Sequence, residues 1–310
     1  MTEPIAYLNG RFVPVSQAAL HVFDLGVVGG VAVSEMLRTF RHEPFRVDEH
    51  LARLRQSLAL TGLAPRVPMD ELRDVLLQVV RHNTGLVSLD DDLGVIVFVT
   101  AGPNPTYVSR DAARDAGCSV GVHTFPLPYA TWAAKYDAGV ELAVSRVPAL
   151  PDEIVDRRIK SRSRLHWTLA DREVRSRFPQ AMALLLDADG AITETAACNV
   201  CVVRNGVLRS PPPGTVLEGV SLGMLYELAG GLRLDGERRR LTVEDLRAAD
   251  EVLLTSTPPC LLPATRFEGQ PIGSGHPGPI YRRLLEAWSD AVGVDIRGQM
   301  QRPTGEPRTP

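Results

Sequence analysis

The sequence of 310 residues predicts two α+β domains joined by an ordered connector. Its first half has the pattern strand, helix, helix and strand, whereas the second half is rich in strands with helices between them. Phe125–Trp132, which contains prolines and aromatic residues, interrupts both patterns. Because each such set of elements can bury its own apolar face, we expect two layered domains facing each other across a cleft.

The first half begins with a predicted hairpin whose two short strands flank an Asn9-Gly10 turn. We expect a helix with Asp48 as its N-cap that ends near Gly62, because leucines recur there at helical spacing. A second helix is expected to follow Pro68. Further strands are expected at 31–40, continued at 45–47, and at 94–100 and 117–124.

The second half begins with a predicted strand at 140–144 and a helix at 161–177 that turns Leu165, Leu169 and Val174 inward. Hairpins are predicted at 183–193 and 199–208, because Asp-Gly and Asn-Gly turns divide these segments. The other expected elements are a helix at 219–231, a capping box of Thr242 and Asp245 before a short helix, a strand at 251–255 and a helix at 279–292.

These elements predict four parts of the chain. Residues 1–124 form a small N-terminal domain, 125–136 a connector and 137–296 a larger, strand-rich C-terminal domain. Residues 297–310 are polar and rich in proline, so we expect a disordered tail there.

Composition excludes several classes of function. A net charge of −3 indicates no nucleic-acid surface, and no apolar run approaches the ~20 residues of a transmembrane helix. The start of the chain lacks the pattern of a signal peptide, and four cysteines are typical of reduced thiols. We therefore expect a cytoplasmic protein. Cys198 and Cys201 have metal-ligand spacing, but in a strand they point to opposite faces, so no metal site is expected.

Lysine is scarce in this chain. Lys135 and Lys160 are the two lysines among 34 basic residues, and arginine occupies the other 32 positions. A lysine amine can lose its proton and attack a carbonyl, which arginine cannot do. Five basic side chains crowd positions 157–164, and their repulsion would lower the pKa of Lys160. The alternative is a solvated basic helix start; Lys135 is expected to be a surface residue of a loop.

Five stretches in order resemble the fold-type IV enzymes that use pyridoxal 5′-phosphate (PLP). These enzymes include branched-chain aminotransferase, D-amino acid aminotransferase and aminodeoxychorismate lyase. The stretches are Tyr7-Leu8-Asn9-Gly10, Glu35 through Glu49-His50-Leu51-Ala52-Arg53-Leu54, Ile159-Lys160-Ser161, Thr193 through Val200, and Leu217 through Ser221 with Thr255-Ser256-Thr257 and Leu262-Pro263. Each stretch alone is weak, but five in the family's order are specific.

The resemblance implies a role for each matched residue. Lys160 would bind PLP as a Schiff base and carry the proton of the reaction, and Glu194 would face the pyridine nitrogen. Arg53 would bind the phosphate, since the Glu-His-x-x-Arg-Leu match selects it over Arg55. The remaining cofactor-binding residues implied are Asn199, Leu217, Val220, Ser221, Ser256 and Thr257, and the cofactor would lie in the cleft between the domains.

The substrate side departs from the family's patterns. The arginines and histidine with which D-amino acid enzymes trap the substrate carboxylate are absent from Ala101 to Tyr107. Leu165 stands where branched-chain enzymes have a tyrosine, and Leu222 where an arginine is common. Arg164 matches the lyase members. Three arginines are therefore candidates for the carboxylate anchor, Arg38, Arg162 and Arg164.

The resemblance predicts a PLP-dependent aminotransferase of the branched-chain or D-amino acid type. It would move an amino group between an amino acid and a 2-oxo acid by a ping-pong route. The alternative is a PLP-dependent lyase resembling aminodeoxychorismate lyase, and a third hypothesis is a binding protein with a vestigial site. The family implies a homodimer.

Overall fold

The structure, a computed structural model, describes residues 3–302 and divides into two units. Unit 1 contains residues 3–127 together with 159–163, and unit 2 contains 128–158 together with 164–302. The sequence pattern placed 159–163 in the second domain, whereas the structure packs this short segment with unit 1. Among the described residues, no helix combines the length and the apolar character that crossing a membrane requires.

Unit 1 is built on a six-stranded antiparallel sheet in the order β2-β1-β6-β5-β3-β4. Its strands are β1 (Ile5–Leu8), β2 (Arg11–Pro14), β3 (Ala32–Phe40), β4 (Glu43–Pro44), β5 (Leu93–Thr100) and β6 (Val120–Pro126). The expected Asn9-Gly10 hairpin is present, with Leu8 opposite Arg11. Glycine suits this turn because its φ of 86° is unfavourable for other residues.

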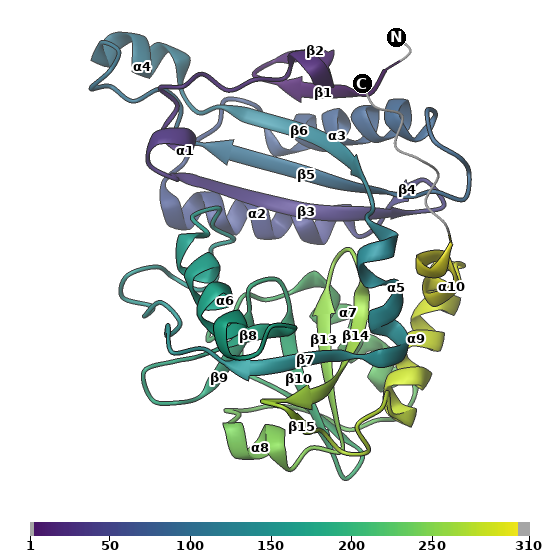
Figure 1. Ribbon diagram of the computed structural model, residues 1–310. Coiled ribbons are helices and arrows are strands. Elements are labelled where there is room, and N and C mark those ends of the chain that lie inside the picture. Colours follow the sequence, from purple (N-terminus) through teal and green to yellow (C-terminus); the bar gives the residue numbers. More distant parts are fainter. Residues whose placement is uncertain (1–2, 303–310) are drawn as a thin grey trace. The chain divides into compact units, whose positions relative to one another are not determined.

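The helices of unit 1 are α1 (Leu25–Val28), α2 (Val47–Thr61), α3 (Met69–Thr84) and α4 (Arg110–Ala116), with a 3-10 turn at Val15–Gln17. Helices α2 and α3 bury leucines and valines against one face of the sheet (Figure 1). Asp48 is not the N-cap of α2: Arg46 is, with a φ of 53°, and Asp48 lies in the first turn. A carboxylate there favours the helix through its dipole, which is why the position resembled a cap.

Unit 2 contains a nine-stranded sheet in the order β12-β11-β10-β13-β14-β7-β8-β9, with β15 beside β14. Its strands are β7 (Val140–Val144), β8 (Ala181–Leu186), β9 (Ile192–Thr195), β10 (Asn199–Arg204), β11 (Val207–Ser210), β12 (Gly236–Arg238), β13 (Glu251–Ser256), β14 (Cys260–Phe267) and β15 (Gln270–Pro271). Strand β9 also pairs with β10, through Glu194 and Asn199. This pairing closes β7, β8, β9, β10, β13 and β14 into a ring and brings the ends of distant segments together.

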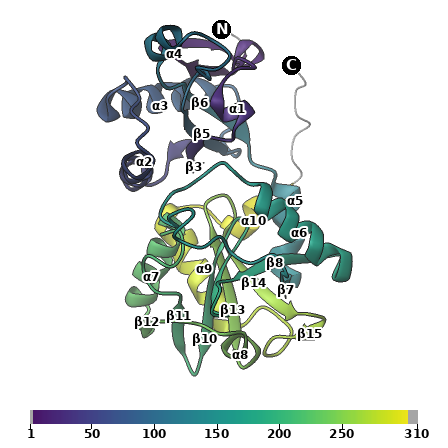
Figure 2. The ribbon, with the colours of Figure 1, turned by 90° about the vertical axis from the view of Figure 1, so that its left-hand side faces the viewer.

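The helices of unit 2 are α5 (Tyr129–Ala138), α6 (Leu165–Arg177), α7 (Val220–Gly231), α8 (Val243–Arg247), α9 (Pro279–Val292) and α10 (Ile296–Gln301). Most of the expected connector is helix α5, which lies beside α10 in both views (Figures 1 and 2). The predicted capping box of Thr242 and Asp245 is present at the start of α8.

The buried face of α6 differs from the one that the sequence predicts. Leu165 is 72% exposed and Leu169 47%, whereas Trp167, Ala170 and Val174 are buried. The helix begins at Leu165 rather than at residue 161, so the pattern that we counted from 161 included an extended segment. Only Val174 of the three expected residues faces the core.

The predicted disordered tail is wrong at its start. Residues 296–301 form α10, and Ile296, Gln299 and Met300 are buried. Asp295 caps this helix, with its carboxylate accepting a bond of 2.9 Å from the Gly298 amide. The polar composition led to the wrong prediction, because three buried residues are enough to pack a short helix against the rest of unit 2. Residues 303–310 of the expected tail lie outside the described residues.

Candidate active site

Lys160 lies on a short extended segment that runs antiparallel to the edge of β3. Its carbonyl accepts a bond of 3.0 Å from the Ser34 amide, and Ser161 pairs with Val33. The Lys160 amide donates to Ser57 Oγ of α2 at 3.1 Å. The lysine is therefore held by its backbone, between a strand and a helix of unit 1. Ser57 was not predicted, because no local signal marks it.

The basic residues around Lys160 do not form one repelling cluster. Arg157 pairs with Asp152 at 2.9 Å, and Arg158 with Asp156 at 2.6 Å. Arg164 donates to the Ala196 carbonyl in unit 2. Nearby acids thus neutralise two of the five basic side chains, and the lowered pKa of Lys160 stays a prediction.

A buried triad of charged and polar groups lies in unit 1, formed by Glu35 of β3 with His50 and Arg53 of α2. Arg53 donates to Glu35 through Nε at 2.8 Å and through a terminal nitrogen at 2.7 Å. Nδ1 of His50 lies 2.7 Å from Glu35 Oε2. Glu35 and His50 are 0% and 1% exposed. The predicted phosphate ligand Arg53 is therefore oriented by a carboxylate.

The triad has shifted pKa values. Burial alone would raise the pKa of Glu35, but the charge and hydrogen bonds of Arg53 and the bond to His50 outweigh it and lower the pKa to about 2. Burial lowers the pKa of His50, and the charges of Arg53 and Lys160 lower it further, against the opposing effect of Glu35. His50 is therefore neutral and donates to an ionised Glu35. The charge of Lys160 makes the smallest of these contributions to the pKa of His50.

Unit 2 brings together a second set of predicted residues. Glu194 lies opposite Asn199 across β9 and β10, and Asn199 lies opposite Thr255 of β13. Asn199 donates to the Leu217 carbonyl at 2.8 Å. A Cβ at residue 219 would lie 2.1 Å from the Asn199 side-chain oxygen, so only glycine allows this close approach. Asn199 thereby positions the segment that leads into α7.

The start of α7 offers donors for an anion. Its N-cap, Gly219, has no side chain to satisfy the first amides, which belong to Val220 and Ser221. Ser256 is the last residue of β13, Thr257 follows it, and both are half-buried. Free helix amides with three hydroxyl groups are a donor set that suits a phosphate. This part of unit 2 therefore fits a phosphorylated cofactor.

Cys198 lies next to these residues and was not predicted as part of the site. The thiol interacts with the side chains of Thr195 and Ser256, and burial raises its pKa to about 11. Lys135 and Glu194 also act on it through their charges. Lys135 is thus not on a loop as expected: it lies in the last turn of α5 and is half-buried.

The three arginines predicted as substrate anchors have separate surroundings. Arg38 is 0% exposed, stacks on Phe40 and lies 3.8 Å from Asp92. Arg162 is exposed in unit 1, where its charge acts on His123. Arg164 belongs to unit 2 and stacks on Trp167.

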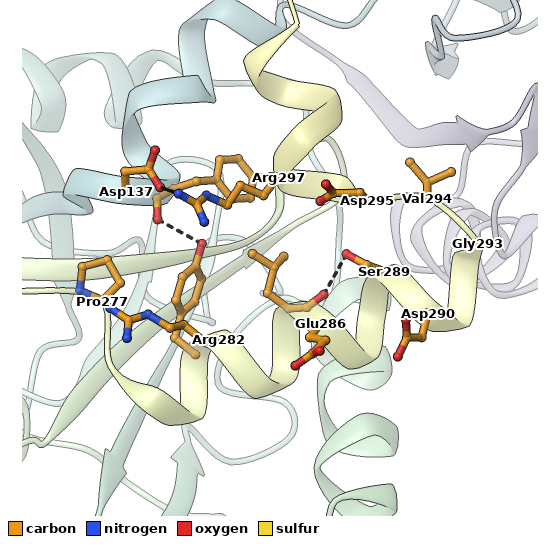
Figure 3. A pocket seen from close by; sticks show the side chains of 13 residues that line it. Asp137, Pro277, Arg282, Glu286, Ser289, Asp290, Gly293, Val294, Asp295 and Arg297 are labelled. Atoms are coloured by element: carbon orange, nitrogen blue, oxygen red, sulfur yellow. Dashed lines mark hydrogen bonds and ion pairs between the residues drawn. The ribbon is translucent and has the colours of Figure 1, made fainter.

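A separate cavity of about 760 Å³ in unit 2 is lined by residues of α5, α9 and α10 and the adjoining loops. Arg297 there pairs with Asp137 (Figure 3). No residue of the predicted site lines this cavity within the part of the chain that the structure describes.

Comparison with known proteins identifies the family of the chain. Residues 32–267 match the family described as Amino-transferase class IV. The chain is 30% identical over 287 residues to D-alanine aminotransferase of Bacillus licheniformis, and the match covers 92% of this chain and 95% of that protein. It is 27% identical over 290 residues to branched-chain-amino-acid aminotransferase of Salmonella typhimurium, covering 91% of each.

Solved structures show the same fold. The T.th. branched-chain amino acid aminotransferase with pyridoxamine 5′-phosphate has a TM-score of 0.82 and 25% identity, covering 94% of each chain. The same enzyme with N-(5′-phosphopyridoxyl)-L-glutamate also has a TM-score of 0.82, at 25% identity, and the match covers 97% of this chain and 96% of that chain. The chain belongs to amino-transferase class IV, and it is a two-domain aminotransferase of fold type IV whose cofactor is pyridoxal 5′-phosphate.

Proposed function

We propose that this aminotransferase uses Lys160 as its cofactor-binding lysine and acts on amino acids with aliphatic side chains. The observation that carries the proposal is the backbone clamp on Lys160, which holds the lysine between β3 and α2, the two elements that carry the Glu35–His50–Arg53 triad. A lysine held on the same two elements as a neutral imidazole and an oriented guanidinium is suited to covalent and proton-transfer chemistry.

When bound, PLP supplies an electrophilic aldehyde carbon and an electron-withdrawing ring. We assign to Lys160 the covalent attachment and the transfer of the substrate Cα proton. Glu194 would keep a proton on the ring nitrogen, as a carboxylate does beside a pyridine nitrogen. Arg53 in unit 1, and in unit 2 the start of α7 with Ser256 and Thr257, would each supply groups that bind phosphate. Leu217 and Asn199 shape the segment that carries these amides.

The type of substrate is supported by the names of the relatives and by the surface of unit 1. The relatives are named for D-alanine and for branched-chain amino acids. On the sheet face opposite α2 and α3, Met36 lies opposite Ile96, and Phe98 follows along β5. This face also carries Ser34, Arg38 and His123, and the apolar side chains among them favour an aliphatic substrate. In the proposed ping-pong route, the amino acid and the 2-oxo acid would bind in turn to the same residues.

The lyase hypothesis depended on Arg164, and the contacts of this arginine do not favour that hypothesis. Arg164 donates to the Ala196 carbonyl, and its guanidinium lies 5.1 Å from the Trp167 ring centroid. These contacts explain the arginine as a structural residue of unit 2. We therefore place transamination first.

Borohydride reduction of the holoenzyme followed by peptide mass mapping tests the assignment. With two lysines in the chain, the outcome is nearly binary: we expect a pyridoxyl group on the Lys160 peptide and none on the Lys135 peptide. Lys160→Ala, treated in parallel, should show no pyridoxyl lysine. Labelling of Lys135, or of neither lysine, contradicts the proposal.

A second measurement separates transamination from elimination. An aliphatic amino acid added without a 2-oxo acid should convert the bound cofactor stoichiometrically to its amine form and release one 2-oxo acid. Catalytic release of product with unchanged cofactor absorption would instead identify a lyase.

We also propose a homodimer in the cytoplasm. The dimer follows from the resemblance, and four free cysteines support a reducing compartment. Light scattering of the purified holoenzyme tests the first point: a monomer mass at micromolar concentration contradicts it.

A further inference from the structure

The last turn of α5, which carries Lys135, is fixed against the hairpin of β13 and β14. The Tyr136 hydroxyl donates to the Pro259 carbonyl. Thr265 Oγ1 of β14 donates to the Ala138 carbonyl at 2.8 Å. Because Pro259 lies in the turn after Ser256 and Thr257, the helix turn with Lys135 is held beside the residues assigned to the phosphate.

Lys135 is half-buried and, within residues 3–302, forms no ion pair. The nearest acid in sequence, Asp137, is occupied by Arg297 at 2.5 Å and by Gln301 at 2.8 Å. A partly desolvated ammonium without a counter-charge is unfavourable, so such a position is a place where an anion is expected.

The surroundings of Cys198 locate this cation. Asn199 pairs with Thr255 and Ser256 pairs with Cys260, so Cys198 neighbours Ser256 across the strands. The charges of Lys135 and Glu194 both act on the Cys198 thiol, which also interacts with Ser256. The charge of Lys135 therefore acts in the part of unit 2 that holds Ser256 and Glu194, next to which the contacts of Tyr136 and Ala138 fix the last turn of α5.

The turn after β13 offers few backbone donors for a carboxylate. Pro258 and Pro259 follow Thr257 in the turn, and proline has no N–H. The amides of α7 and the nearby hydroxyls are assigned to the phosphate. The arginines predicted as anchors are engaged elsewhere or exposed: Arg38 is buried beside Asp92, Arg164 is bonded to Ala196, and Arg162 is exposed to water.

We propose that Lys135 binds the carboxylate of the amino acid and 2-oxo acid substrates. The inference rests on the proposed function, because it assumes that the cofactor occupies the Glu194–Ser256 region. The proposed anchor is a lysine, whereas the sequence suggested three arginines for this role. A lysine suits the position, because a compact ammonium on a flexible stem reaches an anion from a helix turn without the space that a guanidinium needs.

Steady-state kinetics of holoenzyme variants tests the proposal. Lys135→Met should raise KM for both the amino acid and the 2-oxo acid on the order of ten- to hundredfold, as expected for loss of a charged hydrogen bond. Lys135→Arg should retain part of the affinity. Arg172→Met, which removes an exposed charge of α6 in the same unit, is the matched control and should leave KM unchanged.

A non-reacting carboxylate separates binding from catalysis. 4-Methylvalerate should inhibit the native holoenzyme competitively, and the inhibition constant should rise in Lys135→Met as KM does. The dissociation constant for PLP should stay within about twofold of the native value, since the phosphate has its own ligands.

Three results would overturn the inference. The first is an unchanged KM and inhibition constant in Lys135→Met. The second is a loss of PLP affinity without a change in KM, and the third is a rise in KM that occurs in Arg162→Met and not in Lys135→Met.

Failure of the proposed function has a different signature: the native protein then shows no pyridoxyl group on Lys160. If the native holoenzyme binds PLP and does not transaminate, titration with 4-methylvalerate followed by cofactor absorption still decides the role of Lys135.

Discussion

Glu35 holds Arg53 by two hydrogen bonds, 2.8 Å to Nε and 2.7 Å to a terminal nitrogen, in the interior of unit 1. One residue comes from the strand next to Lys160 and the other from the helix that binds the Lys160 amide through Ser57. The pair therefore fixes the guanidinium relative to the lysine. A bidentate pair has a defined plane, so it orients the guanidinium as well as neutralising it.

Glu35→Gln should destabilise the protein strongly. The amide keeps the shape but removes the charge that compensates a buried arginine, at a cost of about 3–5 kcal/mol in the free energy of unfolding. PLP affinity should also fall, because Arg53 loses its orientation. Urea denaturation and PLP titration measure the two effects.

Asp48→Asn is the matched control for that variant. It removes the carboxylate of an exposed ion pair, 3.0 Å from Arg73 of α3, on α2, the helix that carries Arg53. Exposed pairs contribute about 0–1 kcal/mol, so the change should be small. Equal destabilisation by the two substitutions would show that the buried pair has no special role.

Stability should depend on pH through Glu35. Its pKa is about 2 in the folded protein and 4.5 as the reference value for the unfolded chain. The unfolded state therefore binds the proton first as pH falls, and the contribution, about 3 kcal/mol above pH 4.5, is lost between pH 4.5 and 2. The slope of unfolding free energy against pH in this window should be shallower in Glu35→Gln. An equal slope in the two proteins would contradict the shifted pKa.

Gly219→Ala should weaken PLP binding. Its Cβ would lie 2.1 Å from the Asn199 side-chain oxygen, so Asn199 must release the Leu217 carbonyl and the start of α7 must shift. We expect at least a tenfold rise in the PLP dissociation constant, about 1.4 kcal/mol. Gly223→Ala, in the same helix with nothing within 4 Å of the added atom, should bind PLP normally and gain about 0.5–1 kcal/mol of stability. Similar PLP affinities for both variants would mean that Asn199 does not position this segment.

The buried face of α6 can be tested by a pair of alanine substitutions. Trp167→Ala should cost about 3–5 kcal/mol, because Trp167 packs among buried alanines and Val174. Leu165→Ala, at a position 72% exposed, should change the free energy of unfolding by less than about 0.5 kcal/mol. Denaturant unfolding measures both changes. A larger destabilisation by Leu165→Ala than by Trp167→Ala would mean that α6 buries the face that the sequence predicted.

Local chemistry explains the elements that the sequence predicted well. The Asn-Gly and Asp-Gly turns gave hairpins with the expected partners, such as Leu186 opposite Ile192 and Arg204 opposite Val207. Pro68 precedes α3, Gly62 ends α2 with a φ of 70°, and Thr242 with Asp245 caps α8. Each signal lies within a few residues of the structure it specifies, so no distant segment is needed to interpret it.

The errors arose where a distant segment decides the outcome. The extended stretch at 159–163 lies beside β3, so α6 starts later and its apolar face rotates. Helix α10 is ordered by packing on α5. A pattern counted along one segment contains none of these contacts.

Residue type and local spacing indicated the two α+β halves, and the resemblance of five ordered stretches to fold-type IV enzymes indicated Lys160 and Glu194 as candidates. The folded units added that Glu35 and His50 accompany Arg53, that Ser57 binds the backbone of Lys160, and that Lys135 lies on a helix turn held against the β13–β14 hairpin. These relations join residues far apart along the chain. Strand register and helix packing decide which polar groups become partners. Both form only when the whole unit folds.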